Sequence, residues 1–272
     1  MGTIGRRTVL RGALGLAGAG AVSSVAGCSL LRPPSPGLVE GSFRSSARGG
    51  VDTGYAVLYP PDSPTDASLP VVVALHGKGG SHRDVEGLVD LGALMRSGTM
   101  VAPLAVVGVD GGDSYYHRRK DGTDVGAMVT DELVPLLAAR GLDTSRLALM
   151  GWSMGGYGAL LLCATTLKGR VRAVSTMSAA LWQQPGLSAP GAFDDAQDFR
   201  DHDVFGLRTV IGAVPLRVDC GTSDPFIVAN RAFVTGFVEP PEGTFATGGH
   251  TDDYWRTTVP AQIAFASRHL AG

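Results

Sequence analysis

The sequence has few cysteines, few aromatic residues and little charge. Only three of its 272 residues are cysteine, which excludes the dense disulfide framework of small secreted domains. Basic and acidic residues almost balance, at 23 against 25, and the basic ones form no patch that could neutralise a phosphate backbone. No nucleic-acid partner is therefore expected. With 44% hydrophobic residues, the chain is typical of a globular protein with a sizeable core.

The N-terminal stretch lacks acidic side chains and differs from the rest of the chain. The pair Arg6 and Arg7 precedes an apolar, glycine-rich run that is too short for a comfortable membrane span. The segment GRRTVLR resembles a twin-arginine export signal, and VAGC at residues 25–28 resembles the bacterial lipobox. These resemblances imply a lipoprotein signal peptide over residues 1–27, lipid attachment to Cys28, and anchoring at the outer face of a bacterial membrane. The alternative is an ordinary secretory signal in which Cys28 is incidental.

The next segment has prolines, serines and glycines but no hydrophobic periodicity. Residues 28–44 are therefore expected to form a flexible tether, followed by one folded domain over residues 45–272. Cys163 and Cys220 both lie in strongly apolar runs, where a free cysteine commonly behaves as a small core residue. Two buried thiols are favoured over a disulfide.

One pattern recurs through the folded domain: a short apolar run, a glycine-rich turn and a longer helix-like stretch. Strands are expected at 53–61, 71–75, 102–109, 146–150, 171–177 and 215–220, and helices at 83–97, 124–140, 155–168, 225–238 and 252–270. The apolar runs are β-branched and mostly do not alternate, as in strands buried on both faces of a parallel sheet. This predicts a three-layer α/β sandwich with a mostly parallel central sheet. Residues 181–210 are the least regular and are expected to form a short lid over the site.

The stretch GWSMGGYG, residues 151–158, contains the pentapeptide G-x-S-x-G. In a chain with 39 glycines this pattern is expected by chance roughly 0.4 times, so the pentapeptide alone decides little. Its position is more specific, because an expected strand ends at Gly151 and an expected helix begins just after Gly155. A serine on so tight a strand-to-helix turn projects its Oγ above the sheet, which is the geometry of a catalytic nucleophile. Ser153 is therefore predicted to be that nucleophile rather than a structural turn serine.

A serine nucleophile needs a histidine base, and six histidines are available. His250 stands in ATGGHTDDYW, on a loop between glycines and the last expected helix, from which an imidazole could reach across the top of the sheet. The other histidines lie in turns, polar loops, the expected lid or a helix end. His250 is the predicted base.

The third member of such a triad is an acid at the carboxyl end of a strand, where it orients the imidazole. Asp224 follows the expected strand 215–220 by a short turn and fits that place. Asp219 lies inside the same strand, and Asp110 follows an earlier one; both are weaker candidates. The order Ser153, Asp224, His250 is the order found in α/β-hydrolases.

The oxyanion of an acyl-transfer reaction needs two backbone N–H donors. HGKGG follows the expected strand 71–75 directly, so the main-chain amides of Lys78 and Met154 are the predicted donors. His76, Gly77 and Trp152 lie next to these groups in the sequence and are expected at the substrate pocket, with His76 also holding the turn.

Taken together, these segments resemble the esterase branch of the α/β-hydrolase superfamily. The segments that match are HGKGG, VDGGDSYYH, GWSMGGYGALLL, CGTSDPF and GGHTDDYW, and they span residues 71–256. The branch includes esterase D (S-formylglutathione hydrolase), tributyrin-type, feruloyl and acetylxylan esterases, and the antigen 85 mycolyltransferases. The resemblance implies that Ser114 and Tyr116 line the pocket.

The expected activity is that of a serine carboxylesterase, acting on a small-molecule, lipid or glycan ester. An envelope acyltransferase with the same triad is one alternative, and a catalytically silent binding lipoprotein is another. No organic cofactor is expected, and no metal either, because the sequence has no His, Cys and carboxylate cluster with ligand spacing.

Overall fold

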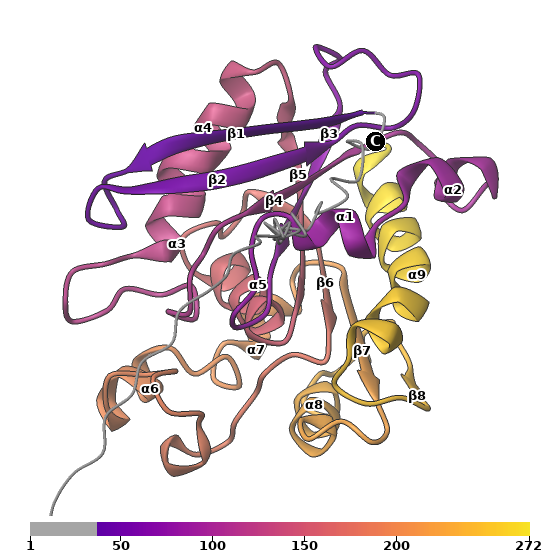
Figure 1. Ribbon diagram of the computed structural model, residues 1–272. Coiled ribbons are helices and arrows are strands. Elements are labelled where there is room, and N and C mark those ends of the chain that lie inside the picture. Colours follow the sequence, from indigo (N-terminus) through magenta and orange to yellow (C-terminus); the bar gives the residue numbers. More distant parts are fainter. Residues whose placement is uncertain (1–36) are drawn as a thin grey trace, which may run out of the picture. The chain divides into compact units, whose positions relative to one another are not determined.

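The computed structural model describes residues 37–272. In this part of the chain the apolar runs assemble into one eight-stranded sheet (Figure 1). The strands are Leu38–Ser45 (β1), Val51–Leu58 (β2), Pro70–Leu75 (β3), Ala105–Val109 (β4), Asp143–Trp152 (β5), Val171–Met177 (β6), Leu216–Gly221 (β7) and Phe245–Ala246 (β8). Their order in the sheet is β1-β2-β4-β3-β5-β6-β7-β8. β2 runs antiparallel to both of its neighbours, and every other pairing is parallel. The predicted mostly parallel sheet is confirmed.

Helices cover both faces of this sheet, which gives the predicted three layers (Figure 1). They are Asp84–Leu88 (α1), Leu91–Arg96 (α2), Val125–Ala127 (α3), Met128–Leu133 (η1, a π-helical turn), Val134–Ala139 (α4), Met154–Ala164 (α5), Pro185–Leu187 (η2, a 3-10 turn), Ala196–Asp201 (α6), Arg208–Ile211 (α7), Ile227–Val234 (α8) and Asp252–Leu270 (α9).

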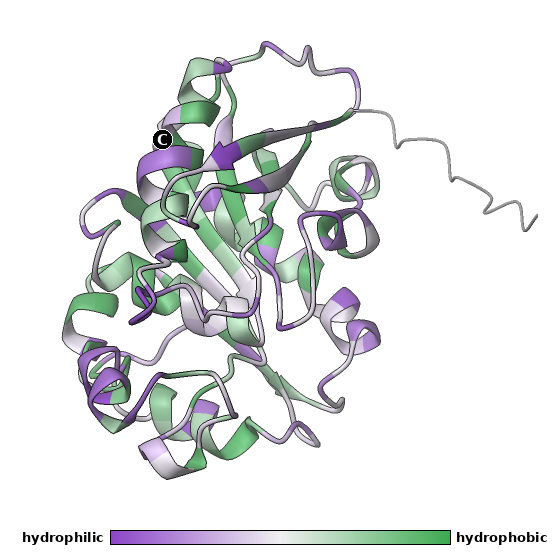
Figure 2. Ribbon diagram, turned by 60° about the vertical axis from the view of Figure 1, so that its left-hand side comes forward, coloured by the Kyte–Doolittle hydropathy of each residue, from purple (hydrophilic) through white to green (hydrophobic). Residues whose placement is uncertain are grey.

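Each face of the sheet has its own hydrophobic core, because side chains alternate across a strand. In β3, Val71 and Val73 pack in a core with residues of η1, α4 and α5, whereas Val72 and Ala74 pack with residues of α1, α2 and α9. Figure 2 shows the hydrophobic residues concentrated along the central strands. Burial on both faces explains why the run PVVVAL does not alternate between apolar and polar residues.

The expected helix over 83–97 is divided into α1 and α2. Val89 is extended, with φ −115° and ψ 114°, and Asp90 begins the second helix by accepting a hydrogen bond from the Ala93 N–H at 2.8 Å. An aspartate side chain that satisfies a helix's free N–H groups favours a new helix start at this point.

The tether predicted for residues 28–44 is wrong over its last seven residues. Leu38–Ser45 form β1, which pairs with β2 from Leu38 opposite Leu58 to Ser45 opposite Val51. β1 lies at the sheet edge and is mostly half-buried or exposed, so it has little of the apolar character that marked the other strands. Its backbone hydrogen bonds to β2 fix its position instead.

The two cysteines of the folded domain are free and buried, as expected. Burial raises the pKa of both Cys163 and Cys220 to about 12. At neutral pH both thiols are protonated, and thiolate chemistry is suppressed at both positions.

The signal peptide predicted over residues 1–27 and the lipidation site Cys28 lie outside the described residues. Within residues 37–272, no helix has the length and apolar character that crossing a membrane requires.

The expected lid, residues 181–210, contains η2, α6 and the start of α7 and is tied to the loop that follows β4. Arg119 donates a hydrogen bond from Nη2 to Asp194 Oδ1 at 2.8 Å, and the Lys120 N–H donates to Asp194 Oδ2 at 2.6 Å. We call residues 181–210 the lid segment below.

Candidate active site

Ser153 lies on the turn between the end of β5 and the start of α5, as predicted. Its backbone has φ 54° and ψ −120°, and residues other than glycine seldom adopt a positive φ. Two hydrogen bonds hold this turn to the chain at the end of β6: the Ser153 N–H donates to Met177 O at 3.0 Å, and the Ala180 N–H donates to Ser153 O at 2.9 Å. The strained turn is thus fixed by its surroundings.

Glycines on either side of Ser153 allow α5 to approach the sheet closely. A Cβ added to Gly155 would lie 1.8 Å from the Leu75 carbonyl oxygen at the end of β3, and one added to Gly151 would lie 2.2 Å from the Gly155 carbonyl oxygen. Both obstacles are backbone atoms. Larger residues therefore cannot occupy these positions without moving the start of α5.

The structure brings Ser153, His250 and Asp224 together in one hydrogen-bonded series. His250 Nε2 lies 2.9 Å from Ser153 Oγ, and His250 Nδ1 lies 2.8 Å from Asp224 Oδ2. The Asp224 side chain is fully buried, whereas a quarter of the His250 side chain is exposed. The series has a shielded carboxylate at one end and an accessible hydroxyl at the other, which is the arrangement of a serine triad.

The environment of Asp224 favours its ionised form. Burial on its own would raise the pKa of this carboxyl group, but the hydrogen bonds from His250 and from the Phe226 N–H lower it below its usual value. The His250 loop is also held beside the Asp224 turn, because the Ser223 N–H donates to Gly248 O at 2.9 Å.

The two rival carboxylates are engaged elsewhere. Asp110 accepts hydrogen bonds from the Gly54 N–H at 3.1 Å and from both the N–H and the ring of His82, at 2.8 and 2.7 Å. Asp219 is paired with Arg217 at 2.7 Å and accepts a hydrogen bond from Gln262 Nε2. Only Asp224 therefore reaches His250 among these three.

Two backbone amides next to Ser153 are available as oxyanion donors. The Met154 N–H stands at the first position of α5, where no intrahelical acceptor exists, and the Lys78 N–H lies in the turn after β3. Within residues 37–272, neither amide donates a hydrogen bond to another group of the protein. The Lys78 side chain is exposed, and its Nζ lies 3.5 Å from the Pro190 carbonyl oxygen.

His76 is buried and holds the turn rather than lining the pocket. Its Nε2 accepts a hydrogen bond from the Gly111 N–H at 2.8 Å, so the ring proton is on Nδ1, which donates to Gly77 O at 2.6 Å. Burial lowers the pKa of His76 below its ordinary value, although the Gly77 carbonyl opposes this shift, so the ring is neutral. The Gly77 carbonyl and the Lys78 N–H belong to one planar trans peptide, so anchoring the carbonyl fixes the opposite direction of the N–H.

The other predicted pocket residues, Tyr116, Trp152 and Ser114, differ in burial and in what they contact. Tyr116 is 1% exposed and donates its hydroxyl hydrogen bond to His76 O at 3.1 Å, so the prediction that it lines the pocket is wrong. Trp152 is also buried, and a Cβ on Gly77 would lie 3.2 Å from its ring. Ser114 lines a polar groove with Arg119.

Sequence reasoning missed the aromatic residues beside His250. The Phe226 ring lies 5.2 Å from the His250 ring, centroid to centroid, and Trp182 of the lid segment lies 5.5 Å from Phe226. Both side chains are half-buried. Phe226 comes two residues after Asp224 in CGTSDPF, which could have indicated its place, but nothing in the sequence near Trp182 connects it to the site.

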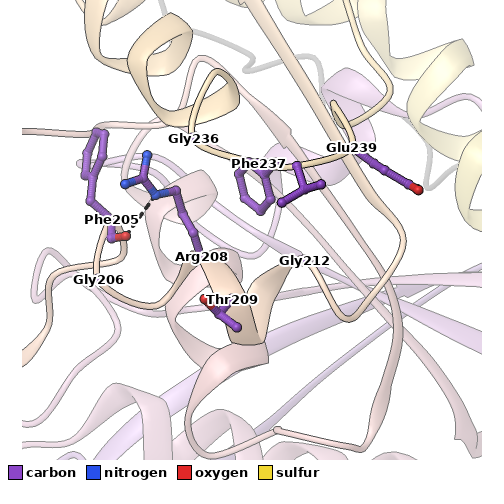
Figure 3. Close-up of a pocket in the computed structure, with 9 residues that line it drawn as sticks. Phe205, Gly206, Arg208, Thr209, Gly212, Gly236, Phe237 and Glu239 are labelled. Carbon is purple, nitrogen blue, oxygen red and sulfur yellow. Dashed lines mark hydrogen bonds between the residues drawn. The ribbon is translucent and has the colours of Figure 1, made fainter.

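A separate groove opens between α7 and the segment that follows α8 (Figure 3). Its lining includes Arg208, whose Nε donates a hydrogen bond to Phe205 O at 3.0 Å, and the ring of Phe237. It contains no residue of the triad or of the oxyanion turn, so we do not assign the ester to it.

The family model described as "Putative esterase" matches residues 46–265, which is most of the chain. The chain belongs to this esterase family. It is accordingly a carboxylesterase-type hydrolase with the α/β-hydrolase fold. No curated protein sequence matches the chain significantly.

Solved structures similar to this esterase include three that the chain matches over most of their length. A ferulic acid esterase has a TM-score of 0.72 at 19% identity, and the match covers 85% of this chain and 98% of that one. An S-formylglutathione hydrolase from Agrobacterium tumefaciens gives 0.71 at 20%, covering 86% and 95%. The fluorophosphonate-binding serine hydrolase F of Staphylococcus aureus gives 0.70 at 18%, covering 86% and 99%. At these identities the likeness concerns the fold.

Proposed function

We propose that this esterase cleaves carboxylic esters with Ser153 as nucleophile, His250 as general base and Asp224 as the acid that orients the imidazole. The observation that carries the proposal is the unbroken series from Asp224 through His250 to Ser153, with contacts of 2.8 and 2.9 Å, at a strained strand-to-helix turn. A binding protein has no need of such a series.

The acylation step follows from this geometry. His250 Nε2 takes the hydroxyl proton as Ser153 Oγ attacks the ester carbonyl carbon, and Asp224 stabilises the imidazolium through Nδ1. The carbonyl oxygen becomes negatively charged and accepts hydrogen bonds from the Lys78 and Met154 N–H groups. Collapse of this intermediate expels the alcohol, which receives the proton from His250 and leaves the acyl group on Ser153.

Deacylation repeats these steps with water. His250 removes a proton from water, the hydroxide attacks the acyl carbonyl, and Ser153 departs with the proton as the carboxylic acid is released.

The half-buried rings of Phe226 and Trp182 give the side of the site next to His250 an apolar wall. An ester with an apolar acyl or alcohol part is the substrate class that this wall favours.

A fluorophosphonate probe tests the nucleophile directly. Wild-type protein should be labelled covalently, and Ser153→Ala should lose both labelling and ester hydrolysis, with a fall in kcat of about 10⁴-fold or more. Ser63→Ala, in a loop before β3, is the matched control and should behave as wild type. Labelling that persists in Ser153→Ala would place the nucleophile elsewhere.

Product analysis with an acyl ester, in the presence and absence of glycerol or trehalose, separates hydrolysis from transfer. Release of free acid alone supports the esterase. An acylated glycerol or trehalose as the main product would identify an acyltransferase that uses the same Ser153 intermediate.

We also propose that the enzyme is exported and attached through Cys28 to the outer face of a bacterial membrane. The support is the arginine pair at Arg6 and Arg7, the apolar run after it, and VAGC at residues 25–28. An apolar ester at or near the membrane surface would then be within its reach.

A further inference from the structure

Asn230 is a fully buried polar side chain that the proposed mechanism does not use. It lies on α8, which packs against β7 (Figure 1). Its Nδ2 lies 2.8 Å from Ala179 O and 3.0 Å from Phe226 O. Both neighbours are carbonyl oxygens, which accept hydrogen bonds, so the amide nitrogen faces them and donates one hydrogen to each.

The Ala179 carbonyl joins Asn230 to the turn that bears the nucleophile. The Ala180 N–H donates to Ser153 O at 2.9 Å, and this N–H belongs to the same planar peptide as the Ala179 carbonyl. Asn230 therefore holds one side of that peptide while Ser153 holds the other. A change in the position of the Asn230 amide would tilt the peptide and move the backbone of Ser153.

Phe226 joins Asn230 to the acid of the triad. The Phe226 carbonyl accepts hydrogen bonds from Asn230 Nδ2 and, at 2.9 Å, from the Asn230 N–H. The Phe226 N–H donates to Asp224 Oδ1 at 2.8 Å. Asn230 thus holds the residue that orients the Asp224 carboxylate.

These contacts complete a closed cycle around the triad. One path from Asp224 to Ser153 runs through the side chain of His250, with contacts of 2.8 and 2.9 Å. The other path runs through Asn230 and the backbone groups that it holds. The imidazole has to fit the span between the two turns, and the second path determines that span.

We infer that Asn230 is a positioning residue of this esterase, which holds the acid turn and the nucleophile turn at the separation that His250 bridges. The inference rests on the proposed mechanism, in which Ser153, His250 and Asp224 act together. It depends on the two hydrogens of one amide nitrogen, on a side chain short enough to serve two carbonyls at once. Leucine has nearly the same shape without a donor, and aspartate has the same shape with an oxygen in place of the nitrogen.

Asn230→Leu removes both donors. Its kcat should fall by about 10²-fold, as expected when catalytic groups are slightly misplaced, and its KM should change by less than about threefold. Fluorophosphonate should label Ser153 more slowly by a similar factor. The control is Thr130→Val in η1, which also removes a buried hydrogen bond, from Thr130 Oγ1 to Gly126 O at 2.9 Å. Assayed below the melting temperature of every variant, this control should keep the kcat of wild type.

Asn230→Asp provides a readout that packing alone would not change. Burial raises the pKa of a carboxyl group, so the new side chain gains a proton as the pH falls and can then donate to one of the two carbonyls. At higher pH its ionised oxygens repel both carbonyl oxygens. The ratio of its kcat to that of wild type should therefore rise by about fivefold or more between about pH 8 and about pH 6. The same ratio for Asn230→Leu should stay constant, because the titration of His250 is common to all three proteins.

Three results would overturn the inference. The first is an Asn230→Leu variant with the kcat and labelling rate of wild type. The second is an equal loss of kcat in Thr130→Val, since the loss of any buried hydrogen bond would then have the same effect. The third is a kcat ratio for Asn230→Asp that does not change with pH, and this measurement decides alone if circular dichroism shows that Asn230→Leu is unfolded. Labelling of wild type that is lost in Ser153→Ala reports separately on the triad, so failure of the inference and failure of the proposed mechanism are distinguishable.

Discussion

At Asp224, two hydrogen-bond donors outweigh the effect of burial on a carboxyl group. Burial alone would favour the protonated acid, yet the contacts with His250 and the Phe226 N–H lower the pKa of this residue. A carboxylate that stays ionised away from water can accept the Nδ1 proton of His250 and fix its tautomer. The chemistry of the triad depends on that tautomer, because only the other nitrogen then faces Ser153.

Asp224→Asn tests this dependence. An asparagine of the same shape offers an N–H in place of a carboxylate oxygen, so it favours the wrong tautomer of His250, and kcat should fall by about 10⁴-fold with the fold intact. Steady-state kinetics and circular dichroism measure the two effects. Asp110→Asn is the matched control, because Asp110 binds His82 and Gly54 instead, and its kcat should remain near wild type. Equal losses of kcat in Asp224→Asn and Asp110→Asn would contradict the assignment of Asp224 as the residue that orients His250.

At the scale of secondary structure, α5 places Ser153 by lying directly on the ends of the strands. Gly155 contacts the backbone of Leu75, and a Cβ on Gly158 would lie 2.4 Å from the ring of Tyr116. The N-terminus of α5 comes directly after Ser153 and the end of β5. Glycines at these positions therefore determine where the nucleophile stands.

Gly155→Ala should lower both stability and activity. Its Cβ would meet backbone atoms that cannot rotate away, an overpacking that typically costs about 1–3 kcal/mol, and the melting temperature should fall by roughly 5 °C. Displacement of the Met154 N–H, a proposed oxyanion donor, should lower kcat and change KM less. Gly87→Ala is the control: Gly87 is an exposed residue of α1 with nothing within 4 Å of the added Cβ, and this variant should be as stable as wild type or more so. A Gly155→Ala variant with the melting temperature and kcat of wild type would contradict the close packing.

The strands differ in how far the sequence could predict them. β3 to β7 were predicted to within a few residues, because strands buried on both faces appear as continuous apolar runs. β1 was mistaken for tether and β8 was not expected, since an edge strand is held by backbone pairing that leaves little trace in hydropathy. The triad was found because Ser153, Asp224 and His250 each follow a recognisable strand end or precede a helix.

For the molecule as a whole, the proposed attachment to a membrane depends on one cysteine, Cys28, which lies outside the described residues. Radiolabelled fatty acid should be incorporated into wild type when the gene is expressed in a bacterial host that processes lipoproteins. Cys28→Ala should incorporate none and should appear in the soluble fraction with its specific activity unchanged. Cys220→Ala, at a buried thiol, is the control and should be labelled as wild type is. Equal labelling of wild type and Cys28→Ala would remove the lipoprotein proposal.

The separation of the triad along the chain has a consequence for the order in which this enzyme folds. The contact between Ser153 and His250 joins residues 97 positions apart, and β6 and β7 stand between β5 and the loop that bears His250. Contacts of such long sequence separation form slowly, because the intervening chain loses entropy when they close. A refolding molecule should therefore recover its helical signal before its esterase activity. A growing chain cannot complete the series from Asp224 to Ser153 before residue 250 has been synthesised and placed.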